Sequence, residues 1–270
     1  MSNCYTGQME DYLEFSKDLA HKAGQIMSQH FAVGVRFSSK SDNTPVTIAD
    51  EDINRMVIEE VARRYPTHAV HGEEASSENS SEYVWVCDPV DGTVPYMKGL
   101  PYAAFSLALV HNGRPEVAVV FDPFSQRLFH AVKEGGAYMN DTKIKVSDLA
   151  LARHATIDVE WWPEADYNID SVLHDVSLNS KAYVLHIGCV VTAACLVAAG
   201  QFEACVFAGT KDKCVDIAAV KLIVEEAGGK VTNIFGEDQR YDGDIAGALI
   251  SNGKVHTALA EALSVLKNTD

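Results

Sequence analysis

The hexapeptide Asp88-Pro89-Val90-Asp91-Gly92-Thr93 places two carboxylates beside a glycine, directly after the apolar run 83–87. That run is apolar on both faces, as in a strand that is covered on both sides. Pro89 has no N–H to donate, so we expect sheet pairing to end there. Two carboxylates at the mouth of a buried strand repel each other, and a divalent cation bound by both removes that cost. We interpret the hexapeptide as half of a metal site and the chain as a metal-dependent enzyme.

Three further acids stand next to predicted elements of structure. Glu73 and Glu74 follow a short predicted strand at 69–71, and Asp216 opens a predicted apolar helix. Carboxylate oxygens suit Mg²⁺, Mn²⁺ or Ca²⁺ rather than Zn²⁺. The backbone carbonyl of Val90, between the two acids of the hexapeptide, is a further candidate ligand.

Several of these residues also have a simpler interpretation. Asp216 is equally explained as an acid favoured at a helix N-terminus. Thr47 and Asp50 are equally explained as a capping box at the start of a helix. Glu74 and Lys40, each taken alone, fit solvated surface groups. Asp88 and Asp91 together resist such an explanation, because burying unpaired carboxylates is costly.

Gly92 and Thr93 supply the second part of the predicted site. A glycine lets the backbone approach a ligand closely. A helix that begins here would direct its free N–H groups toward the metals, forming an anion pocket suited to phosphate. We therefore predict hydrolysis of a phosphomonoester by a metal-activated water. Glu73 is predicted to orient and deprotonate that water, and the Thr93 hydroxyl, tied to Asp50, is the second candidate to position it.

The size and charge of the chain limit the remaining function classes. Its 270 residues allow one large domain or two tightly joined halves. The net charge of −16 argues against binding to nucleic-acid backbones or anionic membranes. The N-terminus lacks the pattern of a signal peptide, and the six cysteines form no CxxC pair. We expect a cytoplasmic protein with reduced thiols.

The rest of the chain must position these residues. Apolar spacing predicts helices at 12–31 and from Thr47 to about Pro66. Strands at 104–110, 117–121, 127–132 and 137–139 read as an antiparallel meander. Strands at 182–187, 204–207 and 246–251 then alternate with helices at 190–199, 216–227 and 255–266, which implies sheets covered by helices. We expect an N-terminal half, 1–150, that carries most metal ligands and a C-terminal half, 151–270, packed as one compact unit.

The combined motifs make the chain resemble the inositol monophosphatase family of Mg²⁺-dependent, lithium-sensitive sugar phosphatases. The hexapeptide matches the first signature of the family, and Gly72-Glu73-Glu74 matches its upstream acidic pair. The segment Val215-Asp216-Ile217-Ala218-Ala219 matches the second signature. Lys40, with Pro45-Val46-Thr47 and Asp50, fits the N-terminal region. The resemblance extends from the first helix to about Leu266, which is nearly the whole chain.

The resemblance implies an α/β fold, a layered αβαβα sandwich with mixed and antiparallel sheets, in a protein that is usually a homodimer. It assigns metal binding to Glu73, Asp88, the Val90 carbonyl, Asp91 and Asp216. It places phosphate against the amides of Gly92 and Thr93, with Asp91, Asp216 and Lys40 as further substrate contacts. Mg²⁺ is the expected cofactor, with Mn²⁺ as an alternative and Li⁺ or Ca²⁺ as inhibitors.

Three departures from the family pattern concern the neighbourhood of the leaving group. Pro95 stands where Asn is common, Val215 where Trp is usual, and Gly209 where inositol-specific members carry Glu; Asp212 lies nearby but out of register. We expect a phosphatase of a small polyol phosphate, with inositol 1-phosphate as the family default. Histidinol phosphate, fructose 1,6-bisphosphate and a 3′-phosphoadenosine are the alternatives. A binding or regulatory protein on a phosphatase scaffold is the alternative of another class.

Overall fold

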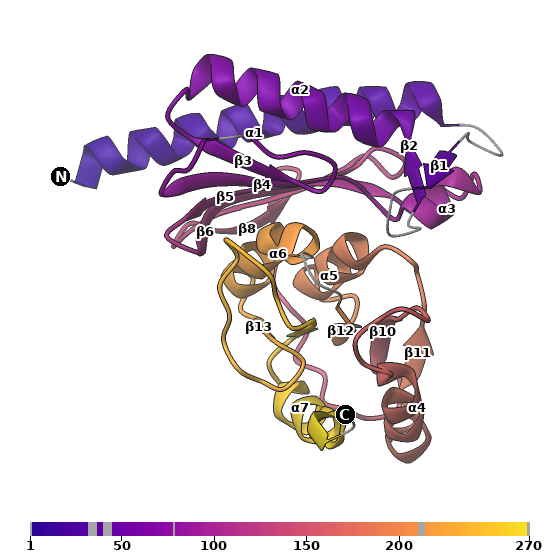
Figure 1. The fold of residues 1–270 in the computed structure, drawn as a ribbon. Coiled ribbons are helices and arrows are strands. Elements are labelled where there is room, and N and C mark those ends of the chain that lie inside the picture. The colour runs from indigo at the N-terminus through magenta and orange to yellow at the C-terminus, as the bar shows by residue number, and fades with distance from the viewer. Residues whose placement is uncertain (1, 32–36, 40–44, 78, 210–213, 269–270) are drawn as a thin grey trace.

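Five layers of structure alternate along the long axis of the molecule (Figure 1). The computed structural model describes residues 2–31, 37–39, 45–77, 79–209 and 214–268. Helices α1 (Ser2–His30) and α2 (Ile48–Arg64) cover a seven-stranded sheet, and α5 (Val190–Ala198) and α6 (Cys214–Glu226) lie between it and a five-stranded sheet. Helices α4 (Ile169–Ser180) and α7 (His256–Leu263), followed by η1 (Ser264–Asn268), form the last layer. The predicted αβαβα sandwich is confirmed.

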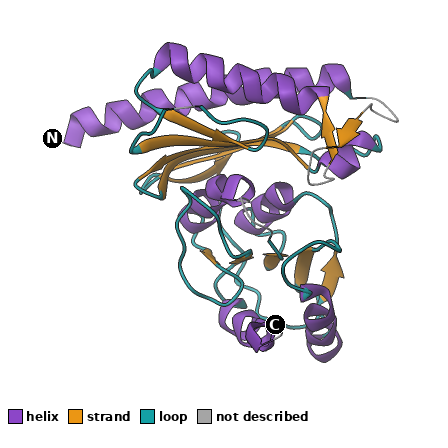
Figure 2. Ribbon diagram, in the orientation of Figure 1, coloured by secondary structure: helices purple, strands orange, loops and turns teal. Residues whose placement is uncertain are grey.

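The seven-stranded sheet is the predicted meander with one parallel strand added at its edge. Its order is β3-β4-β5-β6-β7-β8-β9, and only β3 and β4 run parallel. The strands are β3 (Ala69–Gly72), β4 (Tyr83–Asp91), β5 (Ala104–His111), β6 (Arg114–Asp122), β7 (Arg127–Val132), β8 (Gly136–Met139) and β9 (Thr142–Lys143). Figure 2 shows this sheet between its two helical layers.

The five-stranded sheet has the order β11-β10-β12-β14-β13 and is mixed. Strand β10 runs parallel to β11 and β12, whereas β14 is antiparallel to β12 and β13. These strands are β10 (Thr156–Glu160), β11 (Tyr183–Leu185), β12 (Ala204–Phe207), β13 (Lys230–Thr232) and β14 (Ala248–Ser251). A separate hairpin joins β1 (Phe37–Ser39) to β2 (Pro45–Thr47), close to α3 (Thr93–Met97). We propose the connection between β9 and β10 as the boundary of the halves 1–150 and 151–270.

Strand β4 is buried on both faces over most of its length, as the apolar run 83–87 predicted, and so are β5 and β6. Trp85 and Phe105 pack toward α1 and α2, whereas Val86, Ala104 and Ala108 belong to the cluster around α5 and α6. This alternation follows from the period of two in a strand. Within the described residues, no helix has both the length and the apolar character needed to cross a bilayer.

Two predicted element limits were wrong. The first helix starts at Ser2, well before residue 12. Strand β4 does not end at Pro89 but continues to Asp91, with a shift of register between Asp88 and Asp91. An extra residue on one strand of an antiparallel pair is a β-bulge. A proline is tolerated there because the ladder is already interrupted and needs no N–H at that point.

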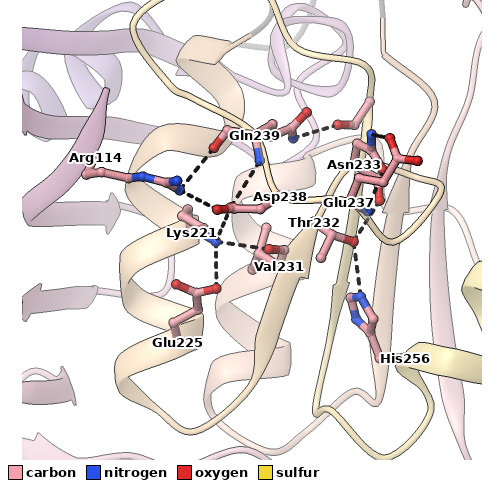
Figure 3. Close-up of polar contacts among 11 residues, drawn as sticks. Arg114, Lys221, Glu225, Val231, Thr232, Asn233, Glu237, Asp238, Gln239 and His256 are labelled. Atoms are coloured by element: carbon pink, nitrogen blue, oxygen red, sulfur yellow. Dashed lines mark hydrogen bonds and ion pairs between the residues drawn. The ribbon is translucent and has the colours of Figure 1, made fainter. Parts of the chain in front are cut away.

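The C-terminal part of α6 is anchored by charged side chains (Figure 3). Lys221 is only 7% exposed, and its Nζ lies 2.6 Å from Glu225 Oε1. The same ammonium donates to the Val231 carbonyl at 3.0 Å and lies 3.5 Å from Asp238 Oδ1. Asp238 also pairs with Arg114 of β6, Nη1 to Oδ2, at 2.7 Å. These contacts join α6 to both sheets.

Candidate metal centre

The parallel pairing of β3 and β4 brings two of the predicted acids to one edge of the sheet. Gly72 lies opposite Cys87 in this ladder, and Glu73 and Asp88 are the next residues on each strand. The Glu73 N–H extends the ladder by donating to the Cys87 carbonyl at 3.1 Å. Because parallel strands end at the same edge, residues separated by a long loop become neighbours.

The bulge in β4 places Asp88 and Asp91 on the same face of the sheet. Residues three apart in a regular strand face opposite sides. Here Asp88 pairs with Ser106 and Asp91 with Ala104, which are two apart on β5 and therefore share a face. Ala104 belongs to the core cluster around α5 and α6. Both aspartates consequently face the helical layer that carries Asp216.

Three of the predicted ligands converge on a buried point between the sheet and α6. Asp88, Asp91 and Asp216 each offer a carboxylate oxygen, and these oxygens lie within 4.8 Å of one another. The three residues are 1%, 9% and 6% exposed, respectively. Asp216 stands in the first turn of α6, where the helix dipole favours a negative charge. The helix-terminus interpretation and the metal-ligand interpretation of Asp216 are thus compatible.

The electrostatics of this cluster are unfavourable without a cation. Burial, together with the charges of Glu73, Asp216 and Asp91, raises the pKa of Asp88 well above its usual range. Burial and the charge of Asp216 raise the pKa of Asp91 to about 7, even though two hydrogen bonds act in the opposite direction. Desolvated like charges favour the protonated form. A hard divalent cation would remove this repulsion, so the donor set fits Mg²⁺.

A second carboxylate cluster adjoins the first, and the charge of its Glu73 acts on Asp88 and Asp91. Oxygens of Asp50, Glu73 and Glu74 lie within 4.8 Å of one another. Asp50 is fully buried; its Oδ2 accepts from the Thr47 backbone N–H at 2.9 Å and also from the Thr47 hydroxyl. Its Oδ1 has no hydrogen-bond partner among the described atoms. Burial raises the pKa of Asp50 to about 7, with the charges of Glu73 and Glu74 adding to it. Asp50 therefore caps α2 and faces the acidic cluster at once.

The predicted link between Thr93 and Asp50 is wrong. The Thr93 hydroxyl donates to the Val90 carbonyl at 3.0 Å, three residues back along the chain. The hydrogen bonds to Asp50 in the described structure come from Thr47. The Val90 carbonyl keeps a second lone pair, so the hydroxyl does not exclude a further role as a ligand. The Val90 N–H donates to Asp88 Oδ1 at 3.0 Å, which fixes the bulge.

Gly92 occupies a position that only glycine fits. Its φ is 81°, in the left-handed region, and it forms the N-cap of α3. A Cβ at this position would lie 2.5 Å from the Tyr102 carbonyl oxygen and 3.0 Å from the Cys189 Cβ. A helix does begin at Thr93, as the anion-pocket hypothesis requires. Lys40, the remaining predicted substrate contact, lies outside the described residues, as does Asp212.

Sequence analysis missed Cys189, which it considered only as one of six reduced thiols. The Sγ of Cys189 lies 2.8 Å from Asp91 Oδ2, and the Val191 N–H donates to the same oxygen at 2.8 Å. Burial raises the pKa of the Cys189 thiol well above its ordinary value, so the thiol is protonated and donates. Asp91 therefore caps the N-terminus of α5 from a distant part of the chain. The only signal in the sequence was the position of Cys189 at the start of a predicted helix.

The alternating layers define a fold of the sugar-phosphatase type, in which buried carboxylates lie beside the start of a helix. The chain belongs to the inositol monophosphatase family, whose family model matches residues 8–267. The family resemblance inferred from the signatures is thereby confirmed.

Individual relatives carry two kinds of name. A Neisseria meningitidis protein named "Putative Nus factor SuhB" is 34% identical over 269 residues, covering 96% of this chain and 98% of its own. An Aquifex aeolicus protein named "Fructose-1,6-bisphosphatase/inositol-1-monophosphatase" is 31% identical over 245 residues, covering 88% and 91%. Among solved structures, the IMPase of Thermotoga maritima superposes with a TM-score of 0.85 at 26% identity, covering 96% of this chain and 99% of that one.

Proposed function

We propose that this protein is a Mg²⁺-dependent phosphomonoester hydrolase of a small polyol phosphate, with inositol 1-phosphate as the first substrate to test. The observation that carries this proposal is the convergence of Asp88, Asp91 and Asp216 within 4.8 Å, all nearly buried. Such a cluster is costly unless a cation is bound, so its presence points to function. Membership of the inositol monophosphatase family supports the reaction class.

Five groups of this chain would hold Mg²⁺: the carboxylates of Glu73, Asp88, Asp91 and Asp216 and the Val90 carbonyl. When bound, Mg²⁺ supplies Lewis acidity for the phosphoryl group and for water, and Mn²⁺ is expected to substitute. The amides of Gly92 and Thr93, at the start of α3, would bind the phosphate oxygens. We expect Li⁺ and Ca²⁺ to inhibit by competing for the same oxygens.

Proton transfer is assigned to the second carboxylate cluster. Glu73 would orient the attacking water and accept its proton, since it belongs to the second cluster and its charge acts on Asp88 of the first. Asp50, buried and with one carboxylate oxygen open, would share that proton. A carboxyl with a pKa of about 7 is matched to proton transfer near neutral pH. Thr93 would act through the Val90 carbonyl, to which its hydroxyl is bonded.

The residue at the predicted leaving-group pocket gives a reason to test several substrates and not inositol phosphate alone. Gly209 has a φ of 77°, and a Cβ there would lie 2.6 Å from the Gly247 backbone nitrogen. A glutamate like that of inositol-specific members therefore has no room at this position. We expect phosphate release with Mg²⁺ when the purified protein is given inositol 1-phosphate, histidinol phosphate, fructose 1,6-bisphosphate or 3′-phosphoadenosine 5′-phosphate, one clearly preferred. Equal, feeble release from all four would contradict a specific phosphatase.

A second candidate function is a binding or regulatory protein on the same scaffold. The observation that favours it is the Nus factor name carried by relatives such as the Neisseria meningitidis protein. The net charge of −16 argues against direct contact with a nucleic-acid backbone. Protein that binds Mg²⁺ in its cluster yet releases no phosphate from any substrate of the panel would support this candidate. In either case we expect a cytoplasmic protein that forms a homodimer. Sedimentation velocity would measure the oligomeric state.

A further inference from the structure

A second buried acidic pair lies outside the metal centre, on β10 of the five-stranded sheet. Asp158 is fully buried and Glu160 is half-buried. Asp158 Oδ1 accepts from the Ile187 N–H at 3.1 Å. Glu160 Oε1 accepts from the Gly188 N–H at 2.8 Å and the Cys189 N–H at 3.2 Å. Three consecutive amides of the segment before α5 are thus held by two carboxyl groups.

The segment held in this way contacts the predicted metal ligand Asp91. The Sγ of Cys189 lies 2.8 Å from Asp91 Oδ2, and the Val191 N–H donates to that oxygen at 2.8 Å. On another side Pro95 of α3 packs closely against the segment, since a Cβ at Gly188 would lie 3.0 Å from Cγ of Pro95. The segment is therefore enclosed between the acidic pair, α3 and Asp91, and its position determines which way the Asp91 carboxylate faces.

The acidic pair is chemically suited to this role. The two carboxyl groups are hydrogen bonded to each other, and burial and the charge of Asp158 raise the pKa of Glu160 to about 9. At neutral pH Glu160 is therefore protonated and donates to Asp158. A neutral Glu160 holds the amides of Gly188 and Cys189 without adding a further negative charge beside Asp91. Glutamine reproduces both the acceptor and the donor of this neutral acid.

We propose that Asp158 and Glu160 are positioning residues that orient Asp91 for metal binding through the segment 187–189. The proposal rests on the proposed function only in taking Asp91 as a ligand. Groups that orient a metal ligand without touching the metal typically change metal affinity by about 10- to 100-fold when they are removed. A purely structural pair would instead change stability and leave metal affinity unaltered.

The test is Mn²⁺ binding to the full chain without substrate, measured by titration calorimetry and by the electron paramagnetic resonance signal of free Mn²⁺. We expect Glu160→Ala to weaken Mn²⁺ binding by about tenfold or more, and Glu160→Gln to stay within about threefold of the wild type. Glu160→Asp, which withdraws the carboxyl by one methylene, should fall between them. If Glu160→Ala does not fold, the Asp and Gln variants carry the comparison.

Glu203 provides a matched control on the neighbouring strand edge. It is 4% exposed and also binds a backbone amide, that of Thr156 at 2.6 Å, at the opposite end of β10. We expect Glu203→Ala to lose stability but to bind Mn²⁺ as the wild type does. Unchanged binding in Glu160→Ala, or an equal loss in Glu203→Ala, overturns the positioning role. A wild-type protein that binds no Mn²⁺ overturns the proposed metal-dependent function as well.

Discussion

The two ends of helix α6 treat charge in opposite ways. At its first turn Asp216 meets Asp88 and Asp91, so that three buried acids have carboxylate oxygens within 4.8 Å of one another. Five residues further along, Lys221 instead contacts the acids Glu225 and Asp238 and donates to the Val231 carbonyl (Figure 3). Repulsive acids can persist at one end because the remainder of the helix is buried and anchored elsewhere. Functional strain is commonly held in place by its surroundings in this way.

The last turn of α6 extends the contrast. Glu226 uses both carboxylate oxygens: Oε1 accepts from the Glu134 N–H and Oε2 from the Gly136 N–H, each at 2.7 Å. These amides belong to the turn between β7 and β8. A carboxylate that accepts two backbone N–H groups is well satisfied. A carboxylate is thus a source of stability at one end of the helix and a source of strain at the other.

The largest expected effect comes from removing charge at the strained end. Asp91→Asn should lower phosphatase activity and Mn²⁺ affinity by more than about a hundredfold, because a ligand is lost. The amide oxygen can still accept from Val191 and Cys189, so the fold should persist. Without metal, the variant should be more stable than the wild type by about 1–2 kcal/mol in urea unfolding, because repulsion is relieved.

The control for that variant is Asp148→Asn, an exposed acid outside both clusters. It should leave activity, metal affinity and stability unchanged. Normal turnover by Asp91→Asn would show that the site is assigned wrongly.

Substitution of Lys221, which anchors α6, should change the stability of the protein rather than its activity. Lys221→Met should lower the free energy of unfolding by about 1–3 kcal/mol, because the buried carbonyl of Val231 loses its donor. The loss is limited because Glu225 and Asp238 are partly exposed and can be solvated. Activity at saturating Mg²⁺ should remain close to normal. Lys254→Met, at an exposed position, serves as the control. An equal loss of stability in both variants would mean that the contacts of Lys221 do not anchor α6.

The pH dependence of stability should report the repulsion among the buried acids. In metal-free protein the pKa of Asp50 and of Asp91 is about 7, above the ordinary 3.8, so the folded state binds more protons than the unfolded state. Stability should therefore fall as pH rises from 6.5 to 8, by about 2–3 kcal/mol. Glu160, with a pKa of about 9, acts in the same direction.

His256 does not contribute between pH 6.5 and 8. Burial lowers its pKa to about 4, so it reduces stability only as pH falls below 6.5. Urea unfolding with a chelator measures the slope. Mg²⁺ at pH 8 should restore the lost stability, and Asp91→Asn should flatten the curve. A stability that rises between pH 6.5 and 8 in the chelated protein would disprove the repulsion.

The smallest expected effect concerns Glu226, in the last turn of α6. Glu226→Gln keeps one acceptor oxygen but turns an NH₂ toward the second amide, which loses its partner. We expect a loss of about 1 kcal/mol in stability, with no change in Mn²⁺ affinity. A change in metal affinity would mean that the two ends of α6 are not independent.

The order of elements and the acids of the centre could be predicted because their signals are local. Asp88, Asp91 and Asp216 each lie beside an apolar run whose end or start is visible in the sequence. The elements β10, β13 and α4 were missed. In β10 the buried Asp158 and the half-buried Glu160 alternate with apolar residues, so its sequence looks like that of a strand with one face in solvent.

The contacts of the site were harder to predict because they depend on tertiary approach. Thr93 was assigned to Asp50, but a carbonyl three residues back competes successfully for its hydroxyl. Cys189 and Glu160 lie about 70 to 100 residues from Asp91 along the chain, and nothing in their local sequence distinguishes them from ordinary core or surface groups. Burial and chain topology, rather than residue type, give them their roles.

The bulge in β4 also limits how the signature can vary. If all the residues were kept but regular pairing were restored between Asp88 and Asp91, Asp91 would lie opposite Ala103, turn toward α1 and α2 and leave its partners. If one of the two intervening residues were deleted, both acids would share a face in a regular strand, but the bulge and its hydrogen bond from the Val90 N–H to Asp88 would be lost. The gap of two residues in this motif is thus the length of a bulge, and the pleat of the sheet decides which way the second acid faces.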